Sequence, residues 1–259
     1  MLYKNKVAVI SGSTSGLGRA IALNLAKEGA RGLVITGRNK ERGEKVVSEL
    51  KDLNCHAAFI QADLVNPQAS EHIFSAVDQH FDGRLHGLVN SAAYTARGSL
   101  ENTPFEEWDK HFAVNVRAPF LLSQEAVRRM QKEKNSGSIV NIASVSAHVG
   151  QEFLTPYSAS KGALVTLSKN IAHSQSRHRI RCNVLLPGWM DTPAEHEIQR
   201  TYHKSPENWL EMAEATRPFG QLIKAHELAE LVVFLLSDKS GIMTGAAIDY
   251  DQIVIGSYD

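Results

Sequence analysis

Seven short apolar runs, each followed by a segment of different periodicity, constrain the fold of this chain more than any other feature. The runs occupy residues 6–10, 32–36, 56–62, 85–89, 138–144, 180–186 and 246–250. Strands that alternate with helices form parallel sheets with helices on both faces, because each crossover must return the chain to the same end of the sheet. The sequence therefore predicts an α/β protein with a doubly wound, seven-stranded parallel sheet, in a single domain over residues 1–259.

Polar or glycine-containing segments follow these runs. Ligands of open parallel sheets bind in the crevice outside the carboxyl ends of the strands. The segments that fall at such ends are Gly12–Gly18, Arg38, Asp63, Asn90, Ser144 and Pro187–Thr192. Their convergence predicts one binding crevice along this edge of the sheet.

Charge and composition exclude several classes of function. Lysine and arginine together number 28, as do aspartate and glutamate, so no charge field indicates a nucleic-acid or membrane partner. The start of the chain has no signal-peptide core, and no apolar run approaches the roughly 20 residues that span a bilayer. Cys55 and Cys182 lack CxxC spacing and are expected to be buried free thiols. We expect a cytoplasmic protein without a metal site.

A glycine-rich turn separates the first apolar run from a helical pattern that ends at Gly29. Glycines let a backbone turn tightly and approach a pyrophosphate, and a helix N-terminus supplies amide donors. The spacing is GxxxGxG rather than GxGxxG. Its position between strand and helix favours phosphate binding over a purely structural turn. The cofactor contacts expected here are Gly12, Ser13, Ser15, Gly16, Leu17 and Gly18.

Arg38 stands where the ribose-binding acid of an NAD site is expected, about 20 residues after the glycines. No Asp or Glu lies between residues 29 and 40. A guanidinium suits a 2′-phosphate, so the sequence favours NADP, with NAD possible and a solvated loop charge as the structural alternative. Asp63 is suited either to accept a bond from an adenine amino group or to cap the helix after Pro67. The residues leave both roles open.

Tyr157 and Lys161 lie four residues apart in a helical pattern from about 156 to 175, so they share one face. Thr155-Pro156 resembles an N-cap followed by a first-turn proline. Ser144, at the end of the fifth run, would bring a hydroxyl to this first turn. A phenol has a pKa of about 10, and a neighbouring ammonium favours its ionised form. The three groups suit proton transfer to or from a carbonyl or alcohol oxygen, although Tyr-x-x-x-Lys alone more often forms a solvated helix face.

Residues 104–134 form one continuous helical pattern. The side chains spaced for burial are Trp108, Phe112, Val116, Phe120 and Leu121. Asn115 lies inside this pattern, where asparagine is unfavourable. It therefore either bonds backbone or water at a kink or faces solvent.

A segment of about 190–220 departs from the alternation of strand and helix. Thr192-Pro193 and Ser205-Pro206 each resemble an N-cap with a first-turn proline, which predicts two short helices within 193–217. A small helical excursion at the ligand edge is the natural substrate lid.

The glycine turn, Ser144, Tyr157-x-x-x-Lys161 and Pro187-Gly188 occur in the order and spacing of the short-chain dehydrogenase/reductase family, which the chain resembles over essentially its whole length. The resemblance implies a Rossmann fold, hydride transfer with NAD or NADP, and a homotetramer or, less often, a dimer. It implies that Tyr157 is the catalytic acid/base, that Lys161 lowers its pKa and binds the nicotinamide ribose, and that Ser144 holds the substrate oxygen.

The resemblance also implies roles outside this trio. Asn115 matches the asparagine that positions a proton-relay water, Asp63 the adenine contact and Asn90 the residue behind the cofactor. Thr192 matches the carboxamide contact. The remaining implied cofactor contacts are Leu64, Pro187, Gly188 and Met190.

Two segments depart from the family pattern. Asn90-Ser91-Ala92-Ala93 stands where Asn-Asn-Ala-Gly is usual, so a β-carbon at Ala93 narrows the floor of the cofactor site. Asp249-Tyr250-Asp251-Gln252 stands where Asp-Gly-Gly is common after the last strand. The C-terminal packing, and with it the subunit interface, is therefore open to differ from the family pattern.

We expect an NADP-preferring oxidoreductase that interconverts a secondary alcohol and a carbonyl. The candidate substrate contacts are Ser144, His148, Gln151 and Trp189, with Tyr94, Glu152 and His196 placed nearby. This polar set favours a sugar, polyol or other small polar hydroxy compound. A 3-oxoacyl-type ketoreductase is the enzymatic alternative. A non-catalytic dinucleotide-sensing binding protein is the alternative of another class, disfavoured because the serine, tyrosine and lysine are all present.

Overall fold

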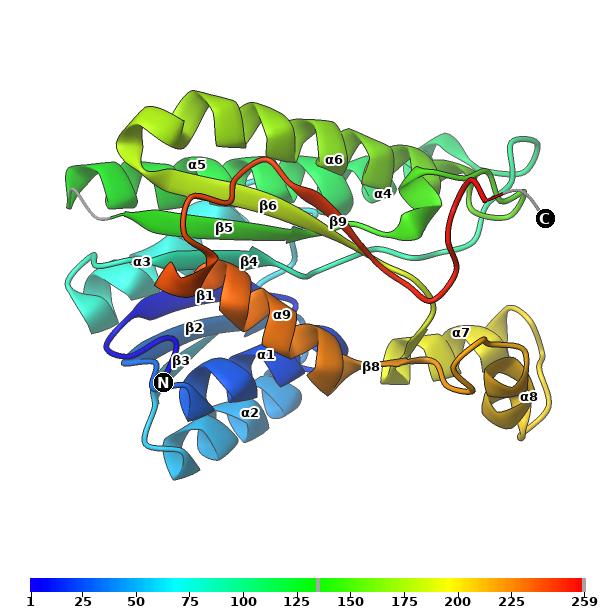
Figure 1. Ribbon diagram of the computed structural model, residues 1–259, viewed down its shortest axis with the longest axis horizontal. Coiled ribbons are helices and arrows are strands. Elements are labelled where there is room, and N and C mark those ends of the chain that lie inside the picture. The colour runs from blue at the N-terminus through cyan, green and yellow to red at the C-terminus, as the bar shows by residue number, and fades with distance from the viewer. Residues whose placement is uncertain (134–135, 258–259) are drawn as a thin grey trace.

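The computed structural model describes residues 1–133 and 136–257. Seven strands form one sheet in the order β3-β2-β1-β4-β5-β6-β9, and every pairing is parallel (Figure 1). The strands are β1 (Val7–Ser11), β2 (Gly32–Gly37), β3 (His56–Gln61), β4 (Gly87–Asn90), β5 (Gly137–Ile142), β6 (Ile180–Pro187) and β9 (Ala247–Tyr250). The predicted doubly wound parallel sheet is confirmed. The strand order reverses between β1 and β4, which is where ligands bind in such sheets.

Helices cover both faces of the sheet (Figure 1). One face carries α1 (Gly16–Lys27), α2 (Lys40–Asp52) and α9 (Ala225–Leu236), and the other carries α3 (Ala69–Phe81), α5 (Ala118–Lys132) and α6 (Thr155–Gln175). Each layer encloses an apolar core, represented by Ile21, Leu25 and Val232 on the first face and by Phe74, Leu122 and Met130 on the second. Burial on both faces explains why the strands appear in the sequence as continuous apolar runs.

The helical stretch after β4 is interrupted. It consists of α4 (Phe105–Phe112), a π-helical turn, η1 (Ala113–Arg117), and α5. The predicted single helix over 104–134 was therefore wrong at its centre, and residue 134 lies outside the described residues. The expected burial was also wrong for Trp108 and Phe120, which are 39% and 46% exposed.

The lid predicted at 193–217 contains α7 (Pro193–Thr201) and α8 (Trp209–Ala215), which project at one end of the molecule (Figure 1). The Thr192 hydroxyl accepts from Glu195 N at 3.2 Å, so its predicted N-cap is confirmed. The predicted cap at Ser205 is wrong, because α8 begins only at Trp209. A two-stranded parallel ribbon, β7 (Met190–Asp191) with β8 (Ile223–Lys224), closes the base of the lid. Two-residue strands carry no periodicity, so this ribbon was not predicted.

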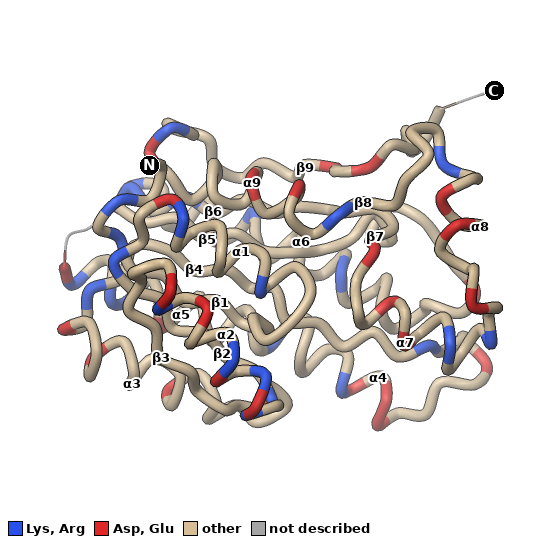
Figure 2. The backbone as a smooth tube through the Cα atoms, turned by 90° about the horizontal axis from the view of Figure 1, so that it is seen from below, with Lys and Arg blue, Asp and Glu red and all other residues tan. Residues whose placement is uncertain are grey.

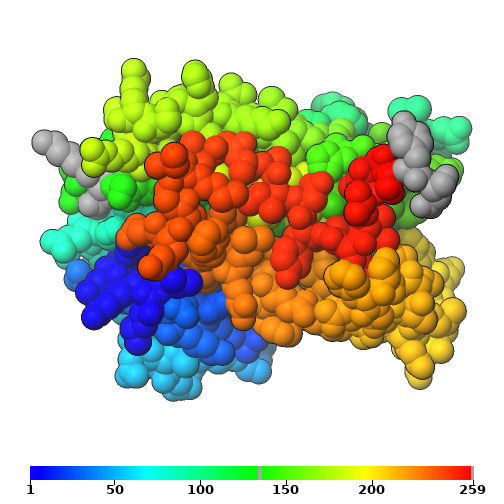
Figure 3. Space-filling view, viewed as in Figure 1, coloured from blue at the N-terminus to red at the C-terminus, as the bar shows by residue number. Residues whose placement is uncertain are grey.

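The segment after β9 lies beside the lid, where red and orange surfaces meet in Figure 3. Gln252 Nε2 donates to Gln221 O at 2.7 Å, and Phe219 N donates to Gln252 Oε1 at 2.8 Å. A β-carbon on Gly188 would lie 2.3 Å from the Asp251 carboxyl carbon. The unusual residues after β9 therefore seat this segment against the lid and against the loop after β6.

Three short 3₁₀ turns complete the fold, η2 (Val145–Ala147), η3 (Ser176–His178) and η4 (Asp238–Ser240). Cys55 and Cys182 are buried and free, as predicted. Among the described helices, none combines the length and apolar character needed to cross a membrane.

Candidate active site

A cavity of about 1800 Å³ extends along the carboxyl ends of the central strands and beneath the lid. Most residues predicted for the site line it, namely Gly12, Ser15, Gly16, Leu17, Gly18, Arg38, Asp63, Leu64, Ser144, Gln151, Tyr157, Lys161, Pro187, Gly188, Trp189, Met190 and Thr192. Four predicted residues, Ser13, Asn90, Asn115 and His148, are absent from the lining. The fold thus gathers one long site from loops far apart in the sequence.

The glycine turn after β1 is shaped by close backbone contacts. Gly12 has φ +66°, and a β-carbon there would lie 2.6 Å from Ala92 Cα. A β-carbon on Gly18 would lie 2.3 Å from the carbonyl oxygen of Gly12. Ser13 is buried, and its hydroxyl donates to Ile10 O at 2.7 Å. Ser13 therefore holds the turn, while the glycines leave backbone amides facing the cavity at the start of α1.

Two guanidinium groups lie at the end of β2. Arg38 and Arg42 both line the cavity, and within the described part of the chain neither forms an ion pair. Asn39 Oδ1 accepts from Arg42 N at 2.8 Å and caps α2, which brings Arg42 one turn from Arg38. Arg42 was not identified from the sequence, although its spacing from Arg38 was a usable signal. Paired cations suit a phosphate group.

Asp63 follows β3 and lines the cavity. Its Oδ1 accepts from Val65 N at 3.0 Å. Helix α3 begins at Ala69 and is preceded by Gln68, so Asp63 does not cap that helix. The sequence left two roles open for Asp63, contact with an adenine amino group or capping of the helix after Pro67. This placement is compatible only with the contact in the cavity.

Ser144, Tyr157 and Lys161 meet at the end of β5. Ser144 caps η2, where its hydroxyl accepts from Ser146 N at 3.2 Å, and it lies close enough to the Tyr157 hydroxyl to lower the pKa of that phenol. Lys161 is buried, with Nζ donating to Ile142 O at 2.7 Å and lying 5.6 Å from the centre of the Tyr157 ring. Helix α6 starts at Thr155, so the predicted N-cap at this residue is wrong, while Pro156 lies in the first turn as predicted.

Burial is the main influence on the pKa values of Tyr157 and Lys161. It raises the pKa of Tyr157 to about 12, while the Ser144 hydroxyl and the charge of Arg97 lower that pKa in part. Burial lowers the pKa of Lys161 to about 7. The role that the family resemblance implies for Lys161, lowering the pKa of Tyr157, stays a prediction. With a pKa of about 7, Lys161 is only partly protonated at neutral pH, so its positive charge there is reduced.

Asn115 occupies the π-helical turn and is completely buried. Its Oδ1 accepts from Tyr94 N at 2.7 Å, and its Nδ2 donates to Tyr94 O at 3.0 Å and to Ser160 Oγ at 2.9 Å. The alternative in which it bonds backbone at a kink is confirmed. Asn115 thereby fixes the loop after β4 against α6, which carries Tyr157 and Lys161.

Asn90 lies at the end of β4, behind the cavity wall. It is buried, and its Nδ2 donates to Asn141 Oδ1 at 2.7 Å. Asn141 in turn donates to Ser168 Oγ at 2.8 Å, which connects β4, β5 and α6. This polar chain was not visible in the sequence, because its members lie on separate elements.

The substrate end of the cavity differs in part from the expected set. His148 faces Asp249, with 2.9 Å between Nε2 and Oδ1, instead of the cavity. His196 pairs with Asp191 at 2.8 Å, and neither His196 nor Glu152 lines the cavity. Tyr94 does line it. The lining also includes residues that no local pattern identified, above all Arg97, Phe153, Glu195 and Asp251.

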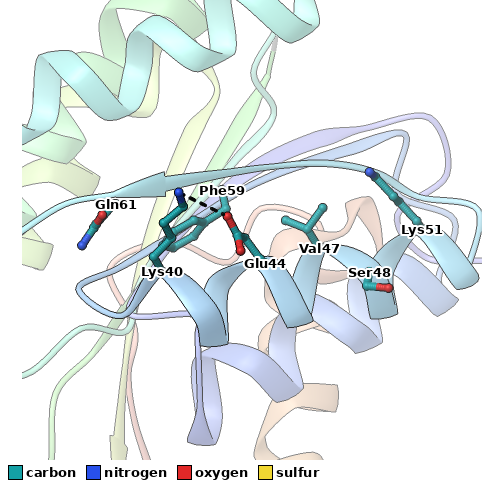
Figure 4. A pocket seen from close by; sticks show the side chains of 7 residues that line it. All are labelled: Lys40, Glu44, Val47, Ser48, Lys51, Phe59 and Gln61. Atoms are coloured by element: carbon teal, nitrogen blue, oxygen red, sulfur yellow. Dashed lines mark ion pairs between the residues drawn. The ribbon is translucent and has the colours of Figure 1, made fainter.

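A second hollow, of about 520 Å³, lies between α2 and β3 (Figure 4). Its charged groups are two lysines and Glu44, and the ion pair Lys40–Glu44 spans it at 3.7 Å. It contains no pair of groups arranged for proton transfer. The chemistry of the protein is therefore placed in the larger cavity.

Comparison with known proteins agrees with this site. A family model described as enoyl-(acyl carrier protein) reductase matches residues 12–252. An uncharacterized oxidoreductase of Thermotoga maritima is 35% identical over 252 residues, which cover 97% of this chain and 98% of that protein. The (3R)-3-hydroxyacyl-CoA dehydrogenase of Rattus norvegicus is 32% identical over 95% of both chains.

Among solved structures, L-sorbose reductase from Gluconobacter frateurii, complexed with NADPH and L-sorbose, superposes with a TM-score of 0.91. It is 27% identical, and the match covers 100% of this chain and 99% of that one. The chain belongs to the short-chain dehydrogenase/reductase family of oxidoreductases, as its motifs predicted.

Proposed function

We propose that this protein catalyses the NADP(H)-dependent interconversion of a secondary alcohol and a carbonyl compound, with Tyr157 as the acid/base. The observation that carries the proposal is that Ser144, Tyr157 and Lys161 meet in a cavity continuous with the glycine turn. A proton donor and a dinucleotide cradle in one cavity are the two requirements of carbonyl reduction by a nicotinamide.

The cofactor end of the cavity fits a dinucleotide. Gly12 and Gly18 leave out the β-carbon at two tight backbone contacts of the turn, and the start of α1 would offer amide donors to a pyrophosphate. Arg38 and Arg42 suit a 2′-phosphate, which supports NADP as the preferred cofactor, with NAD as the alternative. Asp63 and Leu64 would contact the adenine. The NADPH in the L-sorbose reductase structure is consistent with this preference.

The nicotinamide end has its own set of contacts. Asn90 would lie behind the ring, and the residues that would contact it from the loop after β6 are Pro187, Gly188, Met190 and Thr192. Lys161 would bind the ribose. A bound nicotinamide would supply hydride to the carbonyl carbon in its reduced form and accept hydride from the alcohol carbon in its oxidised form.

The residues of this chain manage the substrate oxygen and its proton. Ser144 donates a hydrogen bond to the carbonyl oxygen, and Tyr157 gives that oxygen its proton during reduction. With a pKa of about 12, Tyr157 carries this proton throughout the neutral range. In the oxidation Tyr157 must accept the proton, so any positive charge nearby promotes that direction. Asn115 positions the loop and helix around these groups, and a proton-relay water beside it stays a prediction.

The polar side chains that the substrate end places among apolar ones, such as Gln151, Arg97 and Glu195, support a sugar, polyol or other small polar hydroxy compound as substrate, with Gln151 and Trp189 as candidate contacts. A 3-oxoacyl-type ketoreductase remains the second candidate, favoured by the 3-hydroxyacyl-CoA dehydrogenase among the relatives. The family resemblance further supports a homotetramer, or a dimer, which sedimentation would test.

The proposal is tested by screening sugars, polyols, hydroxy acids and a 3-oxoacyl-CoA with both cofactors, following the absorbance of the reduced nicotinamide. NADPH is expected to give the higher kcat/KM, and equal turnover with NADH would remove the role of Arg38. Tyr157→Phe is expected to lower kcat by a factor of about 10²–10⁴ while cofactor binding persists. Unchanged turnover in this variant would eliminate the mechanism.

A further inference from the structure

Arg97 is a cation in the cavity to which the proposed reaction assigns no task. It lies on the loop between β4 and α4 and lines the same cavity as Ser144 and Tyr157. Its charge lowers the pKa of the Tyr157 phenol, so the guanidinium lies within electrostatic reach of the reacting group. A bound substrate at Tyr157 would therefore lie in the field of Arg97.

The backbone on both sides of Arg97 is anchored. The carbonyl oxygen of the preceding residue lies 3.1 Å from Nε2 of the buried His111. The next residue, Gly98, accepts from Thr155 N at 3.0 Å. Thr155 and Tyr157 belong to the same first turn of α6. Arg97 is thus held in a fixed place relative to the phenol, as a residue that orients a substrate must be.

The guanidinium itself contacts a histidine, a carbonyl oxygen and an aromatic ring. Its Nε donates to His203 Nε2 at 3.3 Å, one terminal nitrogen donates to Thr95 O at 3.4 Å, and the group lies 5.5 Å from the centre of the Phe153 ring. Among the described residues, no carboxylate forms an ion pair with Arg97. Burial lowers the pKa of Arg97, and the charge of Glu195, acting from beyond ion-pair distance, partly offsets this. A half-buried guanidinium with no carboxylate in direct contact favours an anion, and its planar fork matches a carboxylate.

Glu195 limits which anion can bind. It lines the same cavity, and its Oε1 accepts from Trp189 Nε1 and from Gln199 Nε2, both at 2.8 Å. The negative charge of Glu195 raises the pKa of Tyr157, so it acts on the same reacting group as Arg97. One cation and one carboxylate in the same cavity suit a monoanion that also carries hydroxyl groups, because its carboxylate can pair with Arg97 while a hydroxyl donates to Glu195. A dianionic phosphate ester would keep one negative charge unpaired beside Glu195.

We propose that the substrate is a hydroxy acid, or the corresponding oxo acid, whose carboxylate binds Arg97 while its hydroxyl or carbonyl oxygen lies at Tyr157. This proposal rests on the proposed function and narrows its substrate class from small polar hydroxy compounds to those that carry a carboxylate.

The test compares matched acids and neutral compounds with the NADPH-loaded protein. The pairs are 3-oxobutanoate with methyl 3-oxobutanoate, and 5-oxo-D-gluconate with L-sorbose, and a ketose phosphate is the third arm. Each is measured by NADPH oxidation and by its effect on the fluorescence of bound NADPH. The variants are Arg97→Met, Arg97→Lys and, as a matched change of net charge, Arg84→Met on the exposed loop before β4.

The wild type is expected to prefer the acid in at least one pair. Arg97→Met should lower kcat/KM for that acid by about 100-fold, mainly by raising KM. The same variant should change kcat/KM for the neutral partner by less than about threefold. Arg97→Lys should restore part of the loss, and Arg84→Met should change neither compound.

Equal losses for acid and neutral partner would overturn the proposal, because they would assign Arg97 a structural role in holding the lid. A preference for the neutral compounds or for the ketose phosphate would overturn it as well. If the acid quenches NADPH fluorescence in the wild type but not in Arg97→Met, and no compound is turned over, the carboxylate site stands and the proposed reaction fails.

Discussion

The two ends of the cavity are built on different principles. The glycine turn of the cofactor end is shaped by backbone contacts, since a β-carbon at Gly12 or Gly18 would meet backbone atoms within 3 Å. The substrate end is made of side chains from the loop after β4, the loop before α6, the lid and the segment after β9. Charged residues lie along α7 and α8 and also along α2 beside the cofactor end in Figure 2, whereas the strands of the sheet are almost free of charge. Backbone geometry tolerates little change, while a surface of side chains can be altered without unfolding the protein.

Substitution of Gly12 should have the largest effect, because it breaks the backbone-built end. In Gly12→Ala the new β-carbon meets Ala92 at 2.6 Å with φ at +66°, which we expect to cost about 3 kcal/mol of unfolding free energy and to abolish NADPH binding. Urea unfolding measures the free energy of unfolding, and a fluorescence titration measures NADPH binding.

The matched control for this substitution is Gly150→Ala on the substrate side, where a β-carbon meets no atom within 4 Å. It should change stability by less than about 0.5 kcal/mol. Comparable losses of stability in Gly12→Ala and Gly150→Ala would show that the cofactor end does not depend on its backbone more than the substrate end does.

Lys161 lies where the two ends meet, and its burial should make stability depend on pH. Its pKa falls from 10.5 to about 7 on folding, so between pH 7 and 10 the unfolded chain binds more protons than the folded protein. Stability due to this residue therefore rises with pH through that window. Lys161→Met should be more stable than the wild type by about 2 kcal/mol at pH 6, with the gain shrinking towards pH 9.5.

Urea midpoints at pH 6, 8 and 9.5 measure this trend, since the Tyr157 pKa of about 12 keeps that residue protonated over the same range. A gain that is constant with pH would contradict the assignment of a neutralised lysine. Activity should be lost in this variant at every pH.

Substitution in the lid should have the smallest effect on stability. Lys224 Nζ donates to Asp191 at 2.9 Å and to Glu214 at 2.6 Å, which connects β8 with β7 and α8. Lys224→Met should cost less than about 1 kcal/mol, because these groups are partly exposed, yet raise KM for the substrate several-fold. The Kd of NADPH should not change.

Arg128→Met, which removes a surface ion pair with Glu125 on α5, serves as the control for loss of a charge. An increase in the Kd of NADPH in Lys224→Met would mean that the lid also shapes the cofactor end. High salt should reproduce part of the KM increase in the wild type, since salt screens exposed pairs.

The same contrast explains what could be predicted from the sequence. The sheet, the glycine turn and the Tyr157–Lys161 pair were predictable, because strand alternation and helical spacing are local signals. Arg97 and Glu195 were not, since their importance depends on the loops that bring them to one cavity. His148 was assigned to the substrate from its place in the chain, but Asp249 on the distant strand β9 faces it instead. Asp249 lies 101 positions further along the chain, and no spacing rule reaches that far.

The π-helical turn at Ala113–Arg117 has a further consequence. Such a turn holds one residue more than regular α-helical winding needs, so deleting a single residue there would rotate α4 relative to α5, with Pro119 still leaving one helical hydrogen bond unmade. The deletion would make the hydrogen bonding of the helix more regular, yet it would rotate Asn115 away from Tyr94 and Ser160. At this point of the chain a regular helix and the hydrogen bonds of Asn115 to Tyr94 and Ser160 exclude each other, and the protein retains the irregular turn that allows those bonds.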